Sequence, residues 1–396
     1  MTLSMKARNA TNVLLGTSIE YQAYYLCRFN LAAVLPLLIT AFTLTHSEAG
    51  ALNAIIFLSY ALILFPAGIL GDLVGPRIVI TLGAILSLVM NLLFSYSTSF
   101  QSMMIIQFIN GLGQGMAWGP LTRLMANWYP KERMSLVMSL VSVPLSLGPP
   151  ATFVISGYFA STFGWRSAFQ IPAVILAATT LFFAIYVRDR PEGSSSHSSP
   201  SSTSKRSILQ VLRNREVWLV GVTYFAFFGA IRGLLAWLPT FLVERMGMTL
   251  LGSSSLGALL SLPGIATMFA GTWISDVRLG GRKNLVIAAS LLAPIPILLI
   301  LPQTRDATIV LVMVGSILTL FNTSGALYFA YPAVLLPKEQ VGTASGLIDM
   351  LGYVGIFLSS LTIGIAVDTF KSYDPMFLIL AAMAMFGVVT ILKVKS

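Results

Sequence analysis

The chain has 396 residues, of which 56% are hydrophobic and only 10% are charged, and its formal net charge is +10. A soluble domain carries about 25% charged residues, so this composition excludes an ordinary soluble globular protein. The apolar residues form runs of roughly 20, the length that a helix needs to cross about 30 Å of hydrocarbon. The single cysteine, Cys27, excludes an internal disulfide, and no Cys/His spacing predicts a metal site.

The hydrophobic runs predict twelve membrane helices, six on each side of a polar gap. Residues 1–17 precede them and are polar and mildly basic, unlike a signal peptide, so we expect the first helices themselves to direct insertion. In chain order the predicted helices are 17–43, 49–71, 76–96, 100–127, 134–161, 165–187, 216–243, 249–275, 283–301, 306–335, 340–366 and 373–393.

The polar gap divides the chain into two predicted domains. Residues 193–204 are rich in serine and are flanked by basic residues, which is typical of a flexible linker. The predicted fold class is therefore an all-α membrane protein. It has one six-helix bundle at 1–187, a linker at 188–215 and a second six-helix bundle at 216–396.

Basic residues are unequally divided between the loops on the two sides of the predicted membrane. One side holds Lys6, Arg8, Arg77, Arg123, Lys131, Arg133, Arg188, Arg190, Lys205, Arg206, Arg213, Arg215, Arg278, Arg282, Lys283, Lys338, Lys393 and Lys395. The other side holds Arg166, Arg245, Arg305 and Lys371. This asymmetry predicts that both termini and the linker lie in the cytoplasm, in a cell (plasma) membrane protein. Because the positive charge reports topology, we expect no nucleic-acid partner. The expected partner is the lipid bilayer, and the chain is expected to be a monomer.

The two sets of six helices resemble each other, which indicates an internal repeat. The first helix has Arg28 followed by Pro36, and the seventh has Arg232 followed by Pro239. The second and eighth helices also end alike, in a glycine-containing stretch followed by an aspartate and then by basic residues.

Four ionisable residues fall inside predicted spans, away from their ends: Glu20, Arg28, Arg232 and Asp349. An arginine at the centre of a membrane helix costs about 2.5–3.5 kcal/mol on insertion scales, so each needs a partner or a water-filled cavity. A structural ion pair could neutralise any one of them, and Asp349 could pair with either arginine. Two arginines at matching repeat positions instead favour a binding site at the membrane midplane.

The paired arginines predict a small anionic ligand. A guanidinium offers a planar fork of donors that suits phosphate or carboxylate. Tyr21, Tyr25 and Arg28 are spaced at i, i+4 and i+7, so they share one helix face and are predicted to line the same cavity. If the chain carries anions across the membrane, its two halves must close over the site. Without a bound anion, the two arginines would then repel each other, which gives a hypothesis for obligatory exchange of anions.

Five stretches resemble the organophosphate:phosphate antiporter family of the major facilitator superfamily. They are Tyr21–Asn30 (YQAYYLCRFN), Gln114–Arg123 (QGMAWGPLTR), Trp128–Arg133, Arg232–Phe241 and Gly342–Tyr353. The resemblance implies the twelve-helix fold of that superfamily and exchange of an organic phosphate against phosphate. It also implies that Arg28 and Arg232 bind the phosphate and that further residues surround the cavity, namely Tyr21, Tyr25, Gln114, Trp118 and Tyr353.

The sequence departs from that family in the cavity. Leu64 aligns with a lysine of the second helix, and a histidine of the fifth helix falls at or near Pro144. Glu20 and Asp349 are additional acids, for which we expect a role in ion coupling or as counter-charges. The cavity is therefore predicted to be less cationic than in carriers of phosphate esters.

A second resemblance keeps another function open. Tyr25–Asn30, Phe163–Phe169 and Trp237–Glu244 are similar to the anion:cation symporter family, which implies uptake of carboxylates such as sugar acids with protons or sodium. The charged residues of that family are replaced here. Its first-helix aspartate corresponds to Cys27, and its fourth-helix arginine and glutamate correspond to Gln107 and Gln114. Arg232 matches the antiporters, which makes them the leading interpretation.

The stretch Gly68–Arg77 resembles the loop between the second and third helices of the superfamily. The resemblance implies a cytoplasmic gate that uses Asp72 and Arg77, with Asp276 and Arg282 as repeat counterparts. A carboxylate there can cap a neighbouring helix N-terminus and pair with an arginine.

Two further classes of function have less support in the sequence. The antiporter family includes sugar-phosphate sensors, but the short tail and linker leave little room for a signalling module. No nucleophile–base pair or nucleotide loop indicates an enzyme, and no cofactor is predicted.

Overall fold

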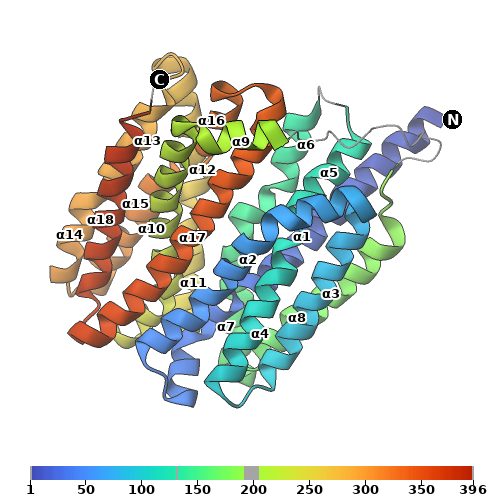
Figure 1. Ribbon diagram of the computed structural model, residues 1–396. Coiled ribbons are helices and arrows are strands. Elements are labelled where there is room, and N and C mark those ends of the chain that lie inside the picture. Colours follow the sequence, from blue (N-terminus) through green and yellow to red (C-terminus); the bar gives the residue numbers. More distant parts are fainter. Residues whose placement is uncertain (1, 131–132, 191–204, 395–396) are drawn as a thin grey trace. The chain divides into compact units, whose positions relative to one another are not determined.

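All regular elements that the structure describes are helices (Figure 1). The structure is a computed structural model, and it describes residues 2–130, 133–190 and 205–394. The serine-rich part of the predicted linker, residues 193–204, lies outside the described residues, as do Lys131 and Lys395.

Within the described residues, nine helices or runs of adjoining helices are long and apolar enough to span a membrane. Seven are single helices: α1 (Thr2–Phe42), α2 (His46–Val74), α3 (Pro76–Ser95), α8 (Ser167–Tyr186), α10 (Arg215–Glu244), α17 (Lys338–Phe370) and α18 (Asp374–Ile391). One run consists of α11 (Leu250–Ser261), α12 (Pro263–Trp273) and η2 (Ile274–Arg278). The other run consists of α13 (Lys283–Leu292), α14 (Pro294–Ile300) and η3 (Leu301–Gln303).

The other three predicted spans are each occupied by two helices. These pairs are α4 (Phe100–Gly115) with α5 (Trp118–Trp128), α6 (Met134–Val141) with α7 (Val143–Phe163), and α15 (Ala307–Asn322) with α16 (Leu327–Leu335). Nine spans and three pairs account, in order, for the twelve predicted spans, which confirms the predicted fold class.

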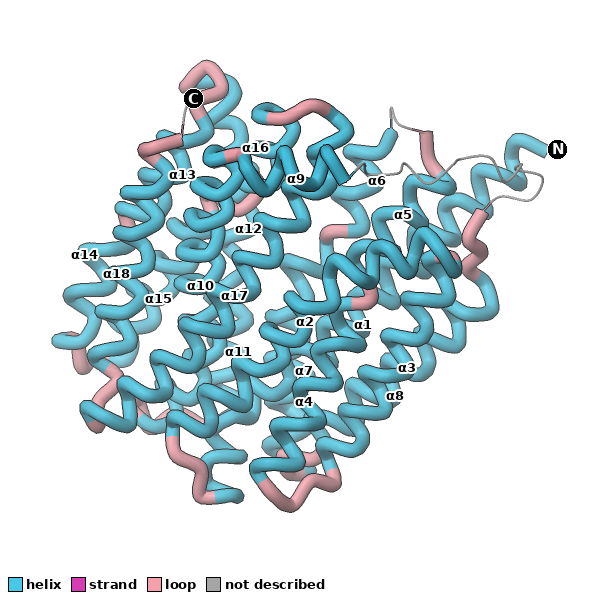
Figure 2. The backbone as a smooth tube through the Cα atoms, in the orientation of Figure 1, coloured by secondary structure: helices cyan, strands magenta, loops and turns pink. Residues whose placement is uncertain are grey.

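Prolines follow directly after several of the helix breaks, which the sequence prediction treated as continuous. Pro120 follows the break between α4 and α5, and Pro144 follows the break between α6 and α7. Pro263 and Pro294 are the first residues of α12 and α14. Proline has no backbone N–H and its ring clashes with the preceding turn, so it interrupts a helix or begins a new one. Figure 2 shows the short non-helical connections along the tube.

The predicted linker at 188–215 contains a helix, α9 (Lys205–Arg213). Val211 of α9 is fully buried. The indole N–H of Trp218 donates to the carbonyl oxygen of Leu212 at 2.8 Å, and the side-chain amide of Gln340 donates to that of Gln210 at 2.9 Å. These contacts with α10 and α17 give the segment partners that its polar sequence did not indicate.

Contacts between Cα atoms divide the chain into two units, and the division crosses α1 and α2. One unit holds Met1–Leu37 and Leu58–Ser201, and the other holds Leu38–Phe57 and Ser202–Ser396. The end of α1 and the start of α2 therefore belong with the helices of the second half. The predicted bundle boundaries placed residues 38–57 with the first six helices and stay a prediction.

In the first unit, buried polar side chains fix α1 against α3 and α8. The side-chain amide of Asn30 donates to Asn91 Oδ1 of α3 at 2.8 Å and to the carbonyl oxygen of Ala168 of α8 at 3.1 Å. The hydroxyl of Tyr24 donates to the carbonyl oxygen of Ile80 at 2.6 Å. Because these groups are buried, each unmade bond would leave a desolvated polar atom, so they set the rotation of α1.

In the second unit, α10 packs along α17 through glycines. A methyl group added at Gly229 would lie 2.7 Å from the carbonyl oxygen of Gly355, and one added at Gly355 would overlap the carbonyl oxygen of Phe225. Small residues let membrane helices approach closely, so their backbones pack directly.

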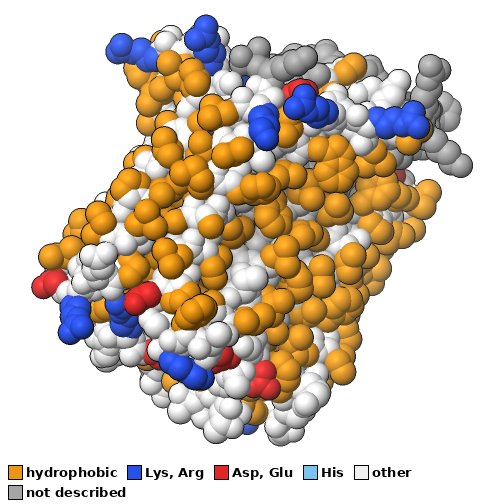
Figure 3. Space-filling model, turned by 60° about the vertical axis from the view of Figure 1, so that its left-hand side comes forward, with side chains coloured by type: hydrophobic (Ala, Val, Ile, Leu, Met, Phe, Trp, Pro, Cys, Tyr) orange, Lys and Arg blue, Asp and Glu red, His pale blue; other side chains and the backbone are white. Residues whose placement is uncertain are grey.

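The outer surface carries many large apolar side chains. Leu62, Leu181, Phe269 and Val312 are each more than half exposed. On the face shown in Figure 3, hydrophobic side chains cover the middle, and charged side chains gather towards the ends. Such a surface suits lipid as the surrounding solvent.

Gly355→Ala should destabilise the protein, because its methyl group would meet a backbone carbonyl that cannot rotate away. Overpacking of this kind costs about 1–3 kcal/mol and should lower the thermal unfolding midpoint in detergent. Gly346→Ala on the same helix is the matched control, since nothing lies within 4 Å of its added methyl group. Equal midpoints for the two variants would contradict the proposed packing.

Candidate functional site

Arg28 lies in the interior of the first unit, with its side chain only 2% exposed. Its Nε donates to Oε1 of Gln114 at 2.9 Å. The guanidinium carbon lies 4.5 Å from the ring centroid of Tyr25 and 4.6 Å from that of Tyr60. These cation–π contacts lower the cost of burying the charge. The bond to Gln114 uses neither Nη atom, the two groups at the tip of the guanidinium fork.

The aromatic residues around Arg28 pack on one another. Tyr21 stacks on Trp118 of α5 at 5.5 Å between centroids and meets Tyr25 edge to face at 5.3 Å. The Arg28 guanidinium is 5.9 Å from the Tyr21 ring. The structure thus brings Tyr21, Tyr25, Gln114 and Trp118 together around Arg28, and their role in binding stays a prediction.

A hydrogen-bond relay of known polarity holds Gln114 in place. Arginine can only donate, so Gln114 must present its oxygen to Arg28 and its nitrogen elsewhere. Gln114 Nε2 donates to Ser87 Oγ at 2.7 Å, and Ser87 Oγ donates to Asn110 Oδ1 at 2.7 Å. Asn110 Nδ2 donates to Gln107 Oε1 at 3.0 Å. The relay therefore fixes the direction in which the Arg28 side chain is held.

Sequence reasoning missed Ser87, Asn110 and Asn91, which form this relay and its link to Asn30. Asn91 Nδ2 lies 3.5 Å from Asn110 Oδ1. Their signal in the sequence is a polar side chain inside an apolar run, which carries a desolvation cost unless it is hydrogen-bonded. Spacing along one helix cannot reveal that residues of α3 and α4 meet behind an arginine of α1.

Arg232 lies in the second unit, on α10, and has a comparable aromatic neighbour. Its guanidinium carbon is 5.2 Å from the ring centroid of Phe228. Tyr353 of α17 meets Phe228 edge to face at 5.6 Å and stacks on Phe57 at 6.3 Å. The structure therefore places Tyr353 next to the aromatic partner of Arg232, and Arg28 and Arg232 each lie beside aromatic rings of their own unit.

The two additional acids lie in different units. Glu20 is 1% exposed, and its Oε1 accepts a hydrogen bond from Thr180 of α8 at 2.8 Å. Its Oε2 has no hydrogen-bond partner among the described residues. Asp349 is half-buried on α17, and none of the ion pairs between described residues includes it. The alternative that Asp349 forms a structural salt bridge has no support within the described part of the chain.

Each acid predicted at the gate pairs with a basic residue. Asp72 Oδ1 pairs with Arg123 Nε at 3.3 Å. Arg77 instead donates through its backbone N–H to Asp189 Oδ1 at 2.8 Å and through its guanidinium to the carbonyl oxygen of Ala184. Asp189, rather than Asp72, therefore caps the start of α3, because the loop after α8 returns to this point.

The repeat counterpart in the second unit also pairs with a basic residue. Asp276 Oδ1 pairs with Lys283 Nζ at 3.3 Å, and Arg282 is the exposed residue that precedes α13. The use of these residues as a gate stays a prediction.

Residues 21–360 match the sequence profile of the Major Facilitator Superfamily. The chain is 26% identical to the glycerol-3-phosphate transporter of Bacillus subtilis (strain 168) over 392 residues, which covers 91% of this chain and 86% of the relative. It is 21% identical to the hexuronate transporter of the same organism over 383 residues, covering 93% and 90% of the two chains.

A solved structure has the same fold. The crystal structure of a bacterial homologue of the human lysosomal transporter Spinster superposes with a TM-score of 0.76 at 17% sequence identity. The match covers 98% of this chain and 95% of that chain.

Ser87→Ala should weaken the Arg28 relay, because Gln114 Nε2 and Asn110 Oδ1 both lose a buried partner. An unsatisfied buried polar group costs about 1–3 kcal/mol, so the thermal unfolding midpoint should fall. Ser161→Ala is the control, since that exposed hydroxyl bonds only within its own helix turn. An unchanged midpoint would contradict the relay.

Proposed function

Since the chain belongs to the Major Facilitator Superfamily, we propose that it is a secondary active transporter that carries small organic anions across a membrane by alternating access. The leading cargo is an organic phosphate or a similar anion, exchanged against phosphate. The observation that carries this proposal is the buried guanidinium of Arg28, oriented by Gln114 and flanked by tyrosine rings.

The chemistry of this arrangement suits an oxyanion. A buried arginine cannot lose its proton, so its charge must be met by a ligand or by its surroundings. The cation–π contacts and the Nε bond hold the group in one orientation. A phosphate or carboxylate with two oxygens can then accept parallel hydrogen bonds from the fork, in the bidentate geometry that strengthens charge-assisted pairs.

Both units contribute to the proposal. Arg232 has its own aromatic neighbour, Phe228, and lies at the repeat position of Arg28. In this proposal both arginines bind the transported anion, as their matching repeat positions in the sequence favour. The similarity to a glycerol-3-phosphate transporter supports phosphate as the bound group.

A carboxylate symporter is the second candidate. The similarity to a hexuronate transporter supports it, and so does Glu20, a buried acid with one oxygen lacking a hydrogen-bond partner among the described residues. Such a group can carry a proton between states that differ in access to water. Asp349 offers a second acid in the other unit.

We also propose the orientation of the chain in a cell membrane. The excess of Lys and Arg in the loops on one side supports a cytoplasmic location for both termini and the linker. The turn at residues 371–373 then faces the opposite side.

Arg28→Lys and Arg232→Lys should each abolish transport, because lysine keeps the charge but loses the planar fork. Purified protein in phosphate-loaded proteoliposomes is given labelled sugar phosphates, and then labelled sugar acids with a pH gradient. Uptake of sugar phosphates supports the leading candidate, and uptake of sugar acids driven by the gradient supports the second.

Arg166→Lys is the matched control for these variants. Arg166 is exposed and lies 4.5 Å from the ring of Trp165, away from Arg28, so transport should be retained. Full transport by both site variants would overturn the assignment of the arginines.

Exchange should be obligatory if the two arginines need an anion between them to approach each other. Vesicles loaded with labelled phosphate should release it rapidly into buffer that contains phosphate. Release into anion-free buffer should be at least about tenfold slower, the effect of 1.4 kcal/mol of charge repulsion. Equally rapid release into both buffers would exclude the repulsion mechanism while leaving the anion site untouched.

A further inference from the structure

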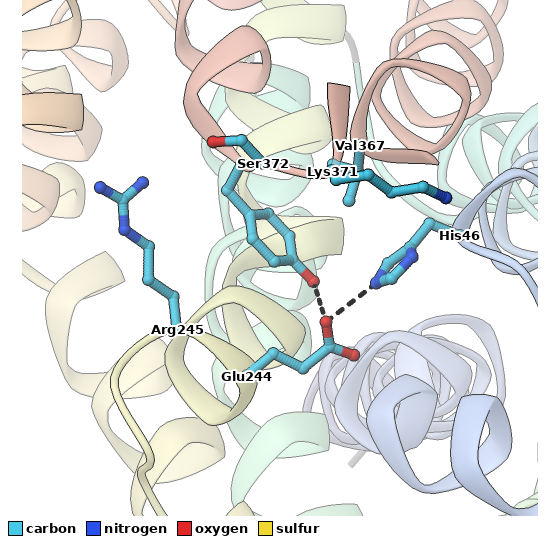
Figure 4. A pocket seen from close by; sticks show the side chains of 7 residues that line it. His46, Glu244, Arg245, Val367, Lys371 and Ser372 are labelled. Carbon is cyan, nitrogen blue, oxygen red and sulfur yellow. Dashed lines mark hydrogen bonds and ion pairs between the residues drawn. The ribbon is translucent and has the colours of Figure 1, made fainter. Parts of the chain in front are cut away.

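A cluster of charged side chains holds the start of α2 against α10 and α17, apart from the arginine sites. A cavity of about 450 Å³ lies at this place. Figure 4 shows His46 pointing towards the carboxylate of Glu244. The cavity is lined by His46, Glu244, Arg245, Val367, Lys371, Ser372 and Tyr373. All of these residues belong to the second unit.

Both ring nitrogens of His46 face carboxylate oxygens. Nε2 lies 2.8 Å from Glu244 Oε2, and Nδ1 lies 3.1 Å from Asp368 Oδ1. An ionised carboxylate can only accept hydrogen bonds, and a neutral imidazole can donate from only one nitrogen. Two donated bonds therefore require the doubly protonated, positively charged ring.

Each of the two carboxylate atoms that face the His46 ring also accepts one further hydrogen bond. Asp368 caps the start of α2, because its Oδ2 accepts the backbone N–H of Ser47 at 2.6 Å and its Oδ1 that of His46 at 3.0 Å. The Tyr373 hydroxyl donates to Glu244 at 2.7 Å. Burial, and then Glu244 itself, raise the pKa of Tyr373 well above its ordinary value, so it stays a donor.

The other charged groups around His46 have separate partners or only line the cavity. Arg245, at the end of α10, pairs with Asp374 of α18 at 2.5 Å. Glu48, on the same helix as His46, accepts the backbone N–H of Thr45 at 2.9 Å. Lys371 follows α17 and lines the cavity. Two carboxylates therefore face one imidazole directly.

The histidine can exchange protons with water. Its side chain is 25% exposed, and those of Glu244 and Asp368 are 30% and 21% exposed. The ring also stacks on Trp237 of α10, at 6.1 Å between centroids, which fixes its plane between the two acids.

We propose that His46 is a proton-binding site that latches residues 38–57 onto α10 and α17. With the proton bound, the imidazolium bridges Glu244 and Asp368 and the segment is docked. Without it, one carboxylate loses the hydrogen bond from the ring, the docked state is weakened and the segment is released.

The sign of the pH dependence follows from linkage. The docked state needs the charged ring, so it binds the proton more tightly than the released state, and docking is favoured at low pH. The stabilisation is complete below the ordinary titration range of histidine, near pH 6.5, and is lost as the pH rises beyond it.

The latch has a consequence for transport, which rests on the proposed function. Because α1 and α2 run continuously from the latched segment into the first unit, release frees the two helix ends that join the units. Proton binding at His46 would then slow the opening of an alternating-access carrier.

Ser360→Cys reports on docking, since Ser360 is fully buried on α17 and Asn53 of α2 donates to its hydroxyl at 3.0 Å. The variant is made with Cys27→Ala, which removes the single native thiol. A polar maleimide is reacted with the full-length protein in nanodiscs at about pH 6 and about pH 8.5, on either side of the histidine range. Rates are divided by those of Thr98→Cys, an exposed reference thiol. The assay needs no substrate, so its outcome is independent of the anion assignment.

The normalised rate at Ser360→Cys should be at least about tenfold higher at the higher pH. Adding His46→Gln should make it fast at both pH values, and His46→Arg, with its permanent charge, should keep it slow at both. If His46→Gln does not fold, Asp368→Asn takes its place with the same expectation. A rate that is independent of pH in the His46 protein, or a pH profile unchanged by these substitutions, would overturn the latch.

Discussion

The burial of the Arg28 charge in the middle of a membrane helix is the constraint on which the first unit depends. Leaving a guanidinium in hydrocarbon without partners is costly, so the surrounding sequence must supply both π-electron density and hydrogen-bond acceptors. Tyr25 and Tyr60 supply the first, and Gln114 supplies the second. The same groups that make the charge tolerable also hold it in a defined direction, which a binding site requires.

The relay behind Gln114 extends this constraint to the packing of the unit. Each member is an amide or hydroxyl buried among apolar residues, and each bond fixes the orientation of the next side chain. A chain of this kind is stable only when it is complete, because every gap leaves a desolvated polar atom. The rotation of α1, the approach of α3 to α4 and the direction of the arginine are therefore set together.

The His46 cluster differs from the relay in its exposure and its charge. Ser87 and Gln114 are fully buried and neutral, whereas His46, Glu244 and Asp368 are charged and reach water. A neutral buried network has one stable arrangement across the physiological pH range. A histidine between two acids has two stable arrangements, because the number of its hydrogen-bond donors changes with protonation. The first suits a permanent scaffold, and the second suits a contact that must be broken and remade.

The sequence alone determined the fold class, the number and order of the membrane spans and the repeat that relates Arg28 to Arg232. Hydrocarbon thickness fixes helix length, and charge in hydrocarbon is rare, so these features are visible along one dimension. It also grouped Tyr21 and Tyr25 with Arg28, because i, i+4 and i+7 share a helix face.

Only the tertiary structure decided which side chains of different helices meet. It placed Ser87 and Asn110 behind Arg28, paired Asp72 with Arg123, and grouped residues 38–57 with the second unit. His46 falls between two predicted helices, and its two acids lie 198 and 322 positions away, so spacing along the chain could not connect them. The periodicity of a helix gives the face of each residue, but packing between helices decides what that face touches.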